Sequence, residues 1–118
     1  MNLEKLYQEM GGDMADAVRR LGSIAAVERF LRMFAGDDTF AMLQAAMSAG
    51  DVQRAFRAAH TLKGLAANLG LVQLGQAASA LTEALRGSDM QRASALYPET
   101  AAAYRQACAA IGDLDTDA

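Results

Sequence analysis

The sequence has 118 residues, a formal net charge of −3 and a hydrophobic fraction of 53%. This length suits one domain that buries a core without disulfides or metals. The lone Cys108 cannot form an internal disulfide, and with a single histidine it cannot complete a structural zinc site. The acidic charge argues against nucleic-acid binding. Because no uncharged apolar run of about 18 residues and no signal peptide are present, we expect no membrane span and a cytoplasmic protein.

Apolar residues recur at spacings of three and four, which is typical of amphipathic helices. The pattern first predicts a short helix that Gly11 stops and a second that Asp13 caps and Gly22 ends. Two apolar stripes then flank residues 36–38. These stripes belong either to one long helix that is locally weakened at residues 36–38 or to two helices that meet at a corner. We expect one helix over roughly 24–49.

Three further helices follow. Asp51 is expected to cap the first of them, and Gly70 to end it in the left-handed conformation. The second ends near Gly87, and Asp89 helps to cap the third. Pro98 lies inside this last helix, where it is expected to kink the helix or mark a fresh start.

Short connections make consecutive helices antiparallel neighbours. The predicted fold is therefore an all-α, antiparallel up-down-up-down four-helix bundle, preceded by one or two short N-terminal helices. We expect a single domain over residues 1–112. Residues 113–118 hold three aspartates and are expected to be a short disordered acidic tail.

The only histidine, His60, falls on the polar face of its predicted helix. Ala59 and Leu62 belong to the core stripe, and at about 100° per residue the opposite face carries residues 53, 57, 60, 64, 67 and 71. We therefore expect His60 to point into water, with Lys63 and Gly64 one turn later.

Gly64 is an unexpected choice in this alanine-rich chain, because glycine in a helix interior costs about 0.5–1 kcal/mol relative to alanine. A missing side chain beside an exposed imidazole leaves room for a large partner. Flanking cations suit an anion such as phosphate, and neutral imidazole is a competent nucleophile. The alternative is a solvated helix face without a function.

The segment AHTLKG at residues 59–64, followed by AANLGL at residues 66–71 and by Leu74, closely resembles the histidine-containing phosphotransfer (HPt) domain of two-component phosphorelays. The resemblance includes the H-x-x-K-G core and a glycine ten residues after the histidine. It covers about residues 20–110, and the family's fold is also a helical bundle.

The resemblance implies a role for each motif residue. His60 matches the phospho-accepting histidine, whose Nε2 attacks the aspartyl phosphate of a receiver domain. Lys63 matches the cation that stabilises the phosphoryl group, and Gly64 the small residue that lets the partner close over the ring. Some members orient the imidazole with a glutamine 22 positions later, where this chain has Thr82 followed by Glu83. Whether Thr82, Glu83, water or nothing holds the Nδ1 side is open.

The sequence has no nucleotide-binding loop and no metalloprotease motif, so we expect a phosphoryl carrier and not an enzyme. The expected partners are receiver domains of hybrid histidine kinases and response regulators, which bring Mg²⁺; the chain itself needs no cofactor and is expected to be a monomer. Two alternatives are an adapter that sequesters receivers without being phosphorylated, and a purely structural bundle.

The surface around the histidine offers candidate receiver contacts. Phe56, one turn before His60, is either an apolar anchor for the partner or a core residue at the edge of the stripe. Arg57 contacts phosphate or receiver, or is simply solvated. Ala67 and Leu71 are expected to extend the same face past Gly64.

Overall fold

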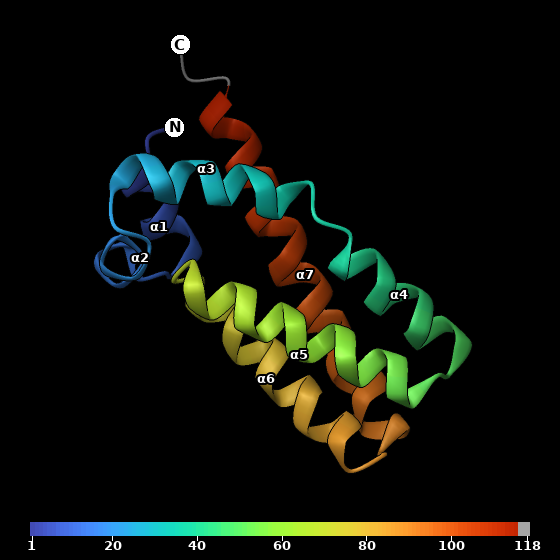
Figure 1. Ribbon diagram of the computed structural model, residues 1–118. Helices are drawn as coiled ribbons and strands as arrows, with labels where there is room; N and C mark the ends of the chain where they lie inside the picture. The colour runs from blue at the N-terminus through green and yellow to red at the C-terminus, as the bar shows by residue number, and fades with distance from the viewer. Residues whose placement is uncertain (116–118) are drawn as a thin grey trace.

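The computed structural model describes residues 1–115, and all of its regular secondary structure is helical. The prediction of an all-α chain is confirmed. Figure 1 shows the helices in chain order: α1 Leu3–Met10, α2 Met14–Leu21, α3 Ile24–Ala35, α4 Thr39–Ala49, α5 Val52–Asn68, α6 Val72–Arg86 and α7 Met90–Asp115.

Most helix ends are set by the residues that the sequence indicates. The side chains of Asp13, Ser23, Asp51 and Asp89 each accept a hydrogen bond from the backbone N–H three residues later, and Asn2 does the same at the start of α1. Gly70, between α5 and α6, adopts a left-handed conformation with φ 64°. These caps satisfy backbone groups that have no partner inside the helix.

The predicted single helix over 24–49 is wrong, because α3 ends at Ala35 and α4 begins at Thr39. Asp37 closes the corner by accepting a hydrogen bond from the backbone N–H of Thr39 at 2.7 Å. Aromatic packing explains the bend. Tyr104 of α7 contacts Phe34 edge-on at 5.6 Å and stacks on Phe40 at 4.2 Å, so one side chain anchors both sides of the corner.

Helix α7 continues past Pro98, which lies inside it as expected, so of the two alternatives at that proline the fresh start is excluded. The helix also extends through Asp115, which makes residues 113–115 of the predicted tail helical. The remainder of that predicted tail, 116–118, lies outside the described residues.

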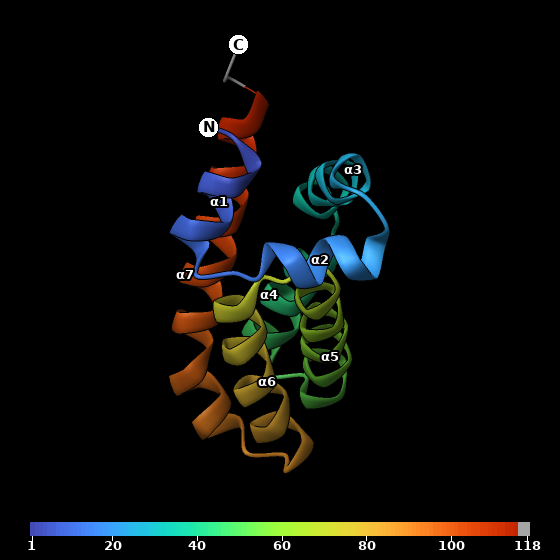
Figure 2. The ribbon, with the colours of Figure 1, turned by 90° about the vertical axis from the view of Figure 1, so that its left-hand side faces the viewer.

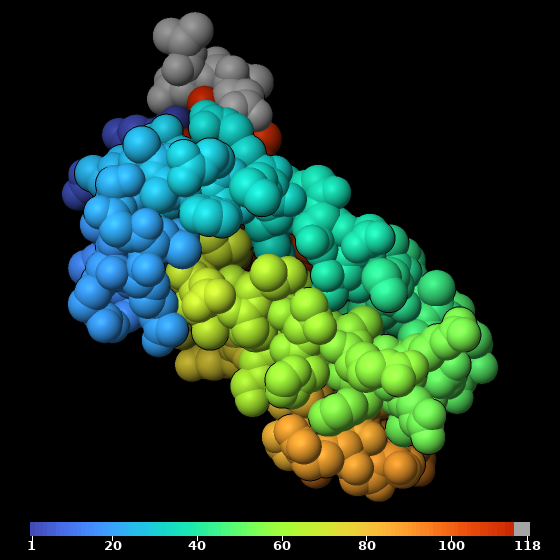
Figure 3. Space-filling view, in the orientation of Figure 1, coloured from blue at the N-terminus to red at the C-terminus, as the bar shows by residue number. Residues whose placement is uncertain are grey.

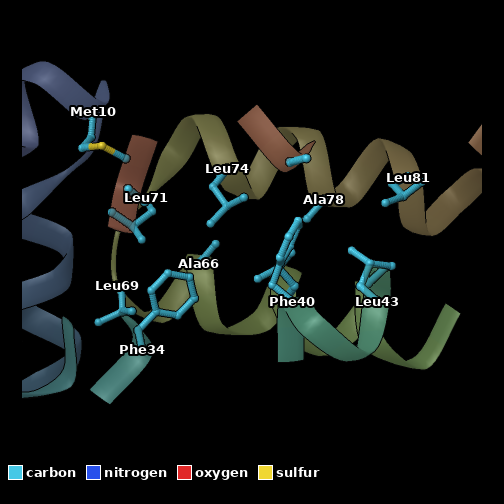
Figure 4. Packing of buried hydrophobic residues seen from close by; sticks show 14 of the residues in the cluster. Met10, Phe34, Phe40, Leu43, Ala66, Leu69, Leu71, Leu74, Ala78 and Leu81 are labelled. Atoms are coloured by element: carbon cyan, nitrogen blue, oxygen red, sulfur yellow. The ribbon is translucent and has the colours of Figure 1, made fainter. Parts of the chain in front are cut away.

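Helix α5 packs between α4 and α6, and α6 packs against α7. The core that they share is aliphatic on α6, where Ala78 and Leu81 face Phe40 and Leu43 of α4, and Leu74 lies toward Ala66 of α5 (Figure 4). Within residues 1–115, no helix combines the length and the apolar character that crossing a membrane requires.

Helix α1 packs against α7, and α2 packs against α3 and α5, close to the end of the bundle where α5 turns into α6 (Figure 2). The buried hydroxyl of Tyr7 donates to the carbonyl of Leu69 at 2.6 Å, and the N–H of Asp13 donates to the carbonyl of Gly70 at 2.8 Å. Burial raises the pKa of Tyr7 to about 12, which keeps this donor protonated. The N-terminal segment therefore holds the α5–α6 turn in place.

Candidate functional site

The candidate site lies on the outer face of α5. The opposite face of this helix is fully buried through Ala55, Ala59, Leu62 and Ala66, which fixes the rotation of the helix about its axis. His60, in the middle of α5, is exposed, as the periodicity predicts. In Figure 3 the green atoms of α5 are open on the viewer's side of the molecule.

Gly64 leaves an open space one turn after His60. A Cβ built on this glycine would meet no atom within 4 Å outside its neighbouring helix backbone, so packing inside the protein does not require glycine. The backbone does not require it either, because Gly64 lies in regular helix and is not among the residues with positive φ. No described residue fills this space, which is therefore open to a partner.

The charges on α5 are all positive. The helix carries Arg54, Arg57 and Lys63 and no acidic residue, in a protein whose net charge is −3. Lys63 is partly exposed and forms no ion pair within residues 1–115. An unpaired ammonium one turn from an exposed imidazole suits an anionic group at the ring.

Among the described residues, the aromatic ring that packs near His60 is that of Phe56. The centroid of the imidazole lies 5.9 Å from that of the phenyl ring, with 39° between the ring planes. The guanidinium carbon of Arg86 on α6 lies 5.0 Å from the same phenyl centroid, and Arg86 also pairs with Glu83 at 3.2 Å. Phe56, Arg57, Leu85 and Arg86 line a hollow of about 380 Å³ between the two helices.

The suggested imidazole partners on α6 are both engaged elsewhere. Thr82 is fully buried, and its hydroxyl donates to the carbonyl of Ala78 at 2.6 Å. A buried hydroxyl that donates to its own helix backbone is not placed to contact the exposed imidazole of His60. The carboxylate of Glu83 pairs with Arg86. No side chain in the described part of the chain forms a hydrogen bond with His60.

The candidate receiver contacts differ in their exposure to solvent. Arg57 and Ala67 are exposed, and Phe56 is half-buried with one side packed on the core. Leu71 is 1% exposed, so the prediction that it extends the outer face is wrong. The helical wheel fails there because α5 ends at Asn68, and the turn at Gly70 directs Leu71 into the core.

Two features of this face were missed by sequence reasoning. The first is Arg86, whose place over Phe56 depends on how α6 packs on α5. The second is a groove of about 640 Å³ between α4 and α5, which reaches Arg57 and Thr61 beside the histidine. The exposed Met42 on its α4 side is a local signal, but the groove itself depends on the corner between α3 and α4.

Comparison with known families identifies a family for most of the chain. The family model described as "Hpt domain" matches residues 25–113, which is most of the chain and includes the whole of α5. Helices α1 and α2 precede the matched region. No curated protein and no solved structure gives a significant match.

Proposed function

This chain belongs to the Hpt domain family, and we propose that it relays a phosphoryl group between receiver-domain aspartates through phosphohistidine at His60. Hpt domains act in two-component phosphorelays as phosphoryl carriers. The histidine, its neighbours and the receiver partners are our assignment. The observation that best supports it is the pair formed by an exposed imidazole and a glycine, one turn later, whose missing side chain serves no internal packing.

The proposed step uses only the ring of His60 from this chain as nucleophile. A ring nitrogen lone pair forms the N–P bond while the acyl P–O bond of the receiver's phosphoaspartate breaks. The aspartate leaves as a carboxylate, and the second ring nitrogen keeps its proton. Reversal of the step on another receiver returns the phosphoryl group to an aspartate. The receiver supplies Mg²⁺ and the pocket around the phosphoryl group.

Other residues of α5 assist this transfer without reacting. Lys63 offsets the charge of the phosphoryl group on the ring, as a cation within reach of an anion does. Gly64 admits the receiver's active site, while Arg57 and Ala67 contact its surface. The basic character of α5 complements the carboxylates that a receiver needs to hold its metal ion.

The site is carried by a bundle of the four helices α4 to α7. Helices α4 to α7 are joined by short connections, and the stacking of Phe40 on Tyr104 closes α4 onto α7. We take these helices to be the antiparallel up-down-up-down bundle that the sequence predicts. Such a bundle keeps α5 straight and its outer face open to a partner.

Incubation with a phosphorylated receiver tests the proposal. We expect the wild-type chain to acquire a label that is labile to acid and stable to base, and His60→Gln to acquire none. Receiver binding without label transfer would indicate a sequestering adapter. If the chain neither binds nor takes up label from any receiver of a broad panel, the remaining interpretation is a purely structural bundle.

A further inference from the structure

The imidazole of His60 is not oriented by a hydrogen bond from any described side chain. Thr82 and Glu83, the two residues at the place where some relatives have a glutamine, are engaged with Ala78 and Arg86. The contact that His60 does have is with the phenyl ring of Phe56. Packing against that ring is therefore the interaction in the structure that can restrict the imidazole.

Phe56 is itself held firmly. It is half-buried, and one side of its ring packs against the hydrophobic core. The Arg86 guanidinium lies 5.0 Å from the phenyl centroid, a distance at which a cation is attracted to an aromatic ring. Arg86 also forms an exposed ion pair with Glu83, one turn earlier on the same helix. The phenyl ring thus offers the imidazole a fixed surface.

We propose that Phe56 is the positioning residue for His60, restricting the imidazole rotamer by ring contact where a hydrogen bond is absent. This inference rests on the proposed phosphotransfer function. Side chains four residues apart on a helix lie on the same face, so Phe56 limits the ring from one side and leaves the side toward Gly64 open. A restricted nucleophile reacts faster because less orientational freedom is lost on reaching the reactive geometry.

Ring contact and hydrogen bonding leave different signatures. A hydrogen bond to one ring nitrogen selects a tautomer, whereas packing on a phenyl ring restricts rotation and selects none. We therefore expect His60 in the unphosphorylated protein to occupy one predominant side-chain rotamer. We also expect the nitrogen chemical shifts of its neutral ring to show averaging between the two tautomers.

The test compares Phe56→Leu, which keeps apolar bulk, with Phe56→Tyr, which keeps the ring. Leu65→Ala is the matched control, because Leu65 is also half-buried on α5 but faces the hollow under α3. The readouts are His60 rotamer populations from three-bond NMR couplings and the rate of labelling by phosphoramidate, a small phosphoryl donor that needs no receiver.

In Phe56→Leu we expect averaged His60 rotamers and a loss of about three- to tenfold in the labelling rate, while Phe56→Tyr and Leu65→Ala stay close to wild type. Unchanged rotamers in Phe56→Leu, or an equal rate loss in Leu65→Ala, would overturn the proposal. A wild-type chain that accepts no phosphoryl group would refute the phosphotransfer function instead. The rotamer comparison would still decide whether Phe56 positions the ring.

Discussion

Gly64 lies one helical turn after His60 on the same exposed face of α5, and the space that its side chain would fill is empty. A glycine that neither packing nor backbone conformation requires is a cost in helix stability without an internal benefit. The benefit is expected at the moment when a partner approaches the imidazole.

Substitutions of Gly64 should separate stability from partner access. Gly64→Ala is expected to stabilise the protein by about 0.5–1 kcal/mol, because alanine is the better helix former and its Cβ meets nothing. Gly64→Leu should reduce phosphoryl transfer from a receiver at least tenfold while leaving labelling by phosphoramidate nearly unchanged. Urea unfolding and the two labelling rates measure these effects.

Ala102→Leu, at an exposed position on α7, is the control for Gly64→Leu. It adds the same side chain to a surface distant from the histidine in the sequence and on another helix. If Gly64→Leu accepts the phosphoryl group from a receiver as fast as this control, the steric role of Gly64 is refuted.

Lys63→Ala should slow transfer to His60 by roughly ten- to a hundredfold, since a charge-assisted hydrogen bond contributes about 1.5–3 kcal/mol. The difference from wild type should shrink at high ionic strength, which screens an exposed cation. Lys5→Ala on α1 is the matched loss of an exposed lysine. Equal rates of phosphoryl transfer in Lys63→Ala and Lys5→Ala, with equal helix content, would show that Lys63 has no role in the transfer.

Tyr7→Phe should destabilise the protein by about 1–2 kcal/mol at neutral pH, because the carbonyl of Leu69 loses its buried donor. The folded-state pKa of Tyr7, about 12, exceeds the ordinary value of 10.0, so folding favours the protonated form. Its contribution is fully present below pH 10 and is lost as the pH rises toward 12. The stability difference between wild type and variant should shrink over that interval, and a constant difference would contradict the assignment.

Two buried threonines should respond oppositely to replacement by valine. The hydroxyl of Thr100 is buried and has no hydrogen-bond partner in the described part of the chain, whereas that of Thr82 donates to Ala78. Thr100→Val should therefore stabilise the protein by roughly 1 kcal/mol, and Thr82→Val should destabilise it by about 0.5–1.5 kcal/mol. Thermal unfolding measures both. A loss of stability in Thr100→Val would show that its hydroxyl is satisfied.

The sequence predicted those parts of the fold that depend on local chemistry. Capping residues such as Asp51 and turn glycines such as Gly70 act within a few residues, so they located the helix ends. The exposure of His60 followed from the spacing of Ala59 and Leu62 in the same helix. Each of these signals is contained in a single stretch of the chain.

The errors arose where distant segments decide the structure. The corner between α3 and α4 depends on Tyr104, which is far along the chain from Phe34 and Phe40 and has no local signature. Leu71 was misplaced because a helical wheel was continued beyond the end of α5. The contact of Arg86 with Phe56 requires the packing of α6 on α5, which periodicity does not specify.

Phosphotransfer through His60 is tested by locating the phosphoryl group on the chain. The wild-type protein is labelled by a phosphorylated receiver, kept at alkaline pH to protect an N–P bond, digested and analysed by mass spectrometry. We expect one modified peptide from α5, with the phosphoryl group on His60. A phosphoryl group found on any other residue, or an unmodified His60 in a protein that has taken up label, would contradict phosphotransfer through His60.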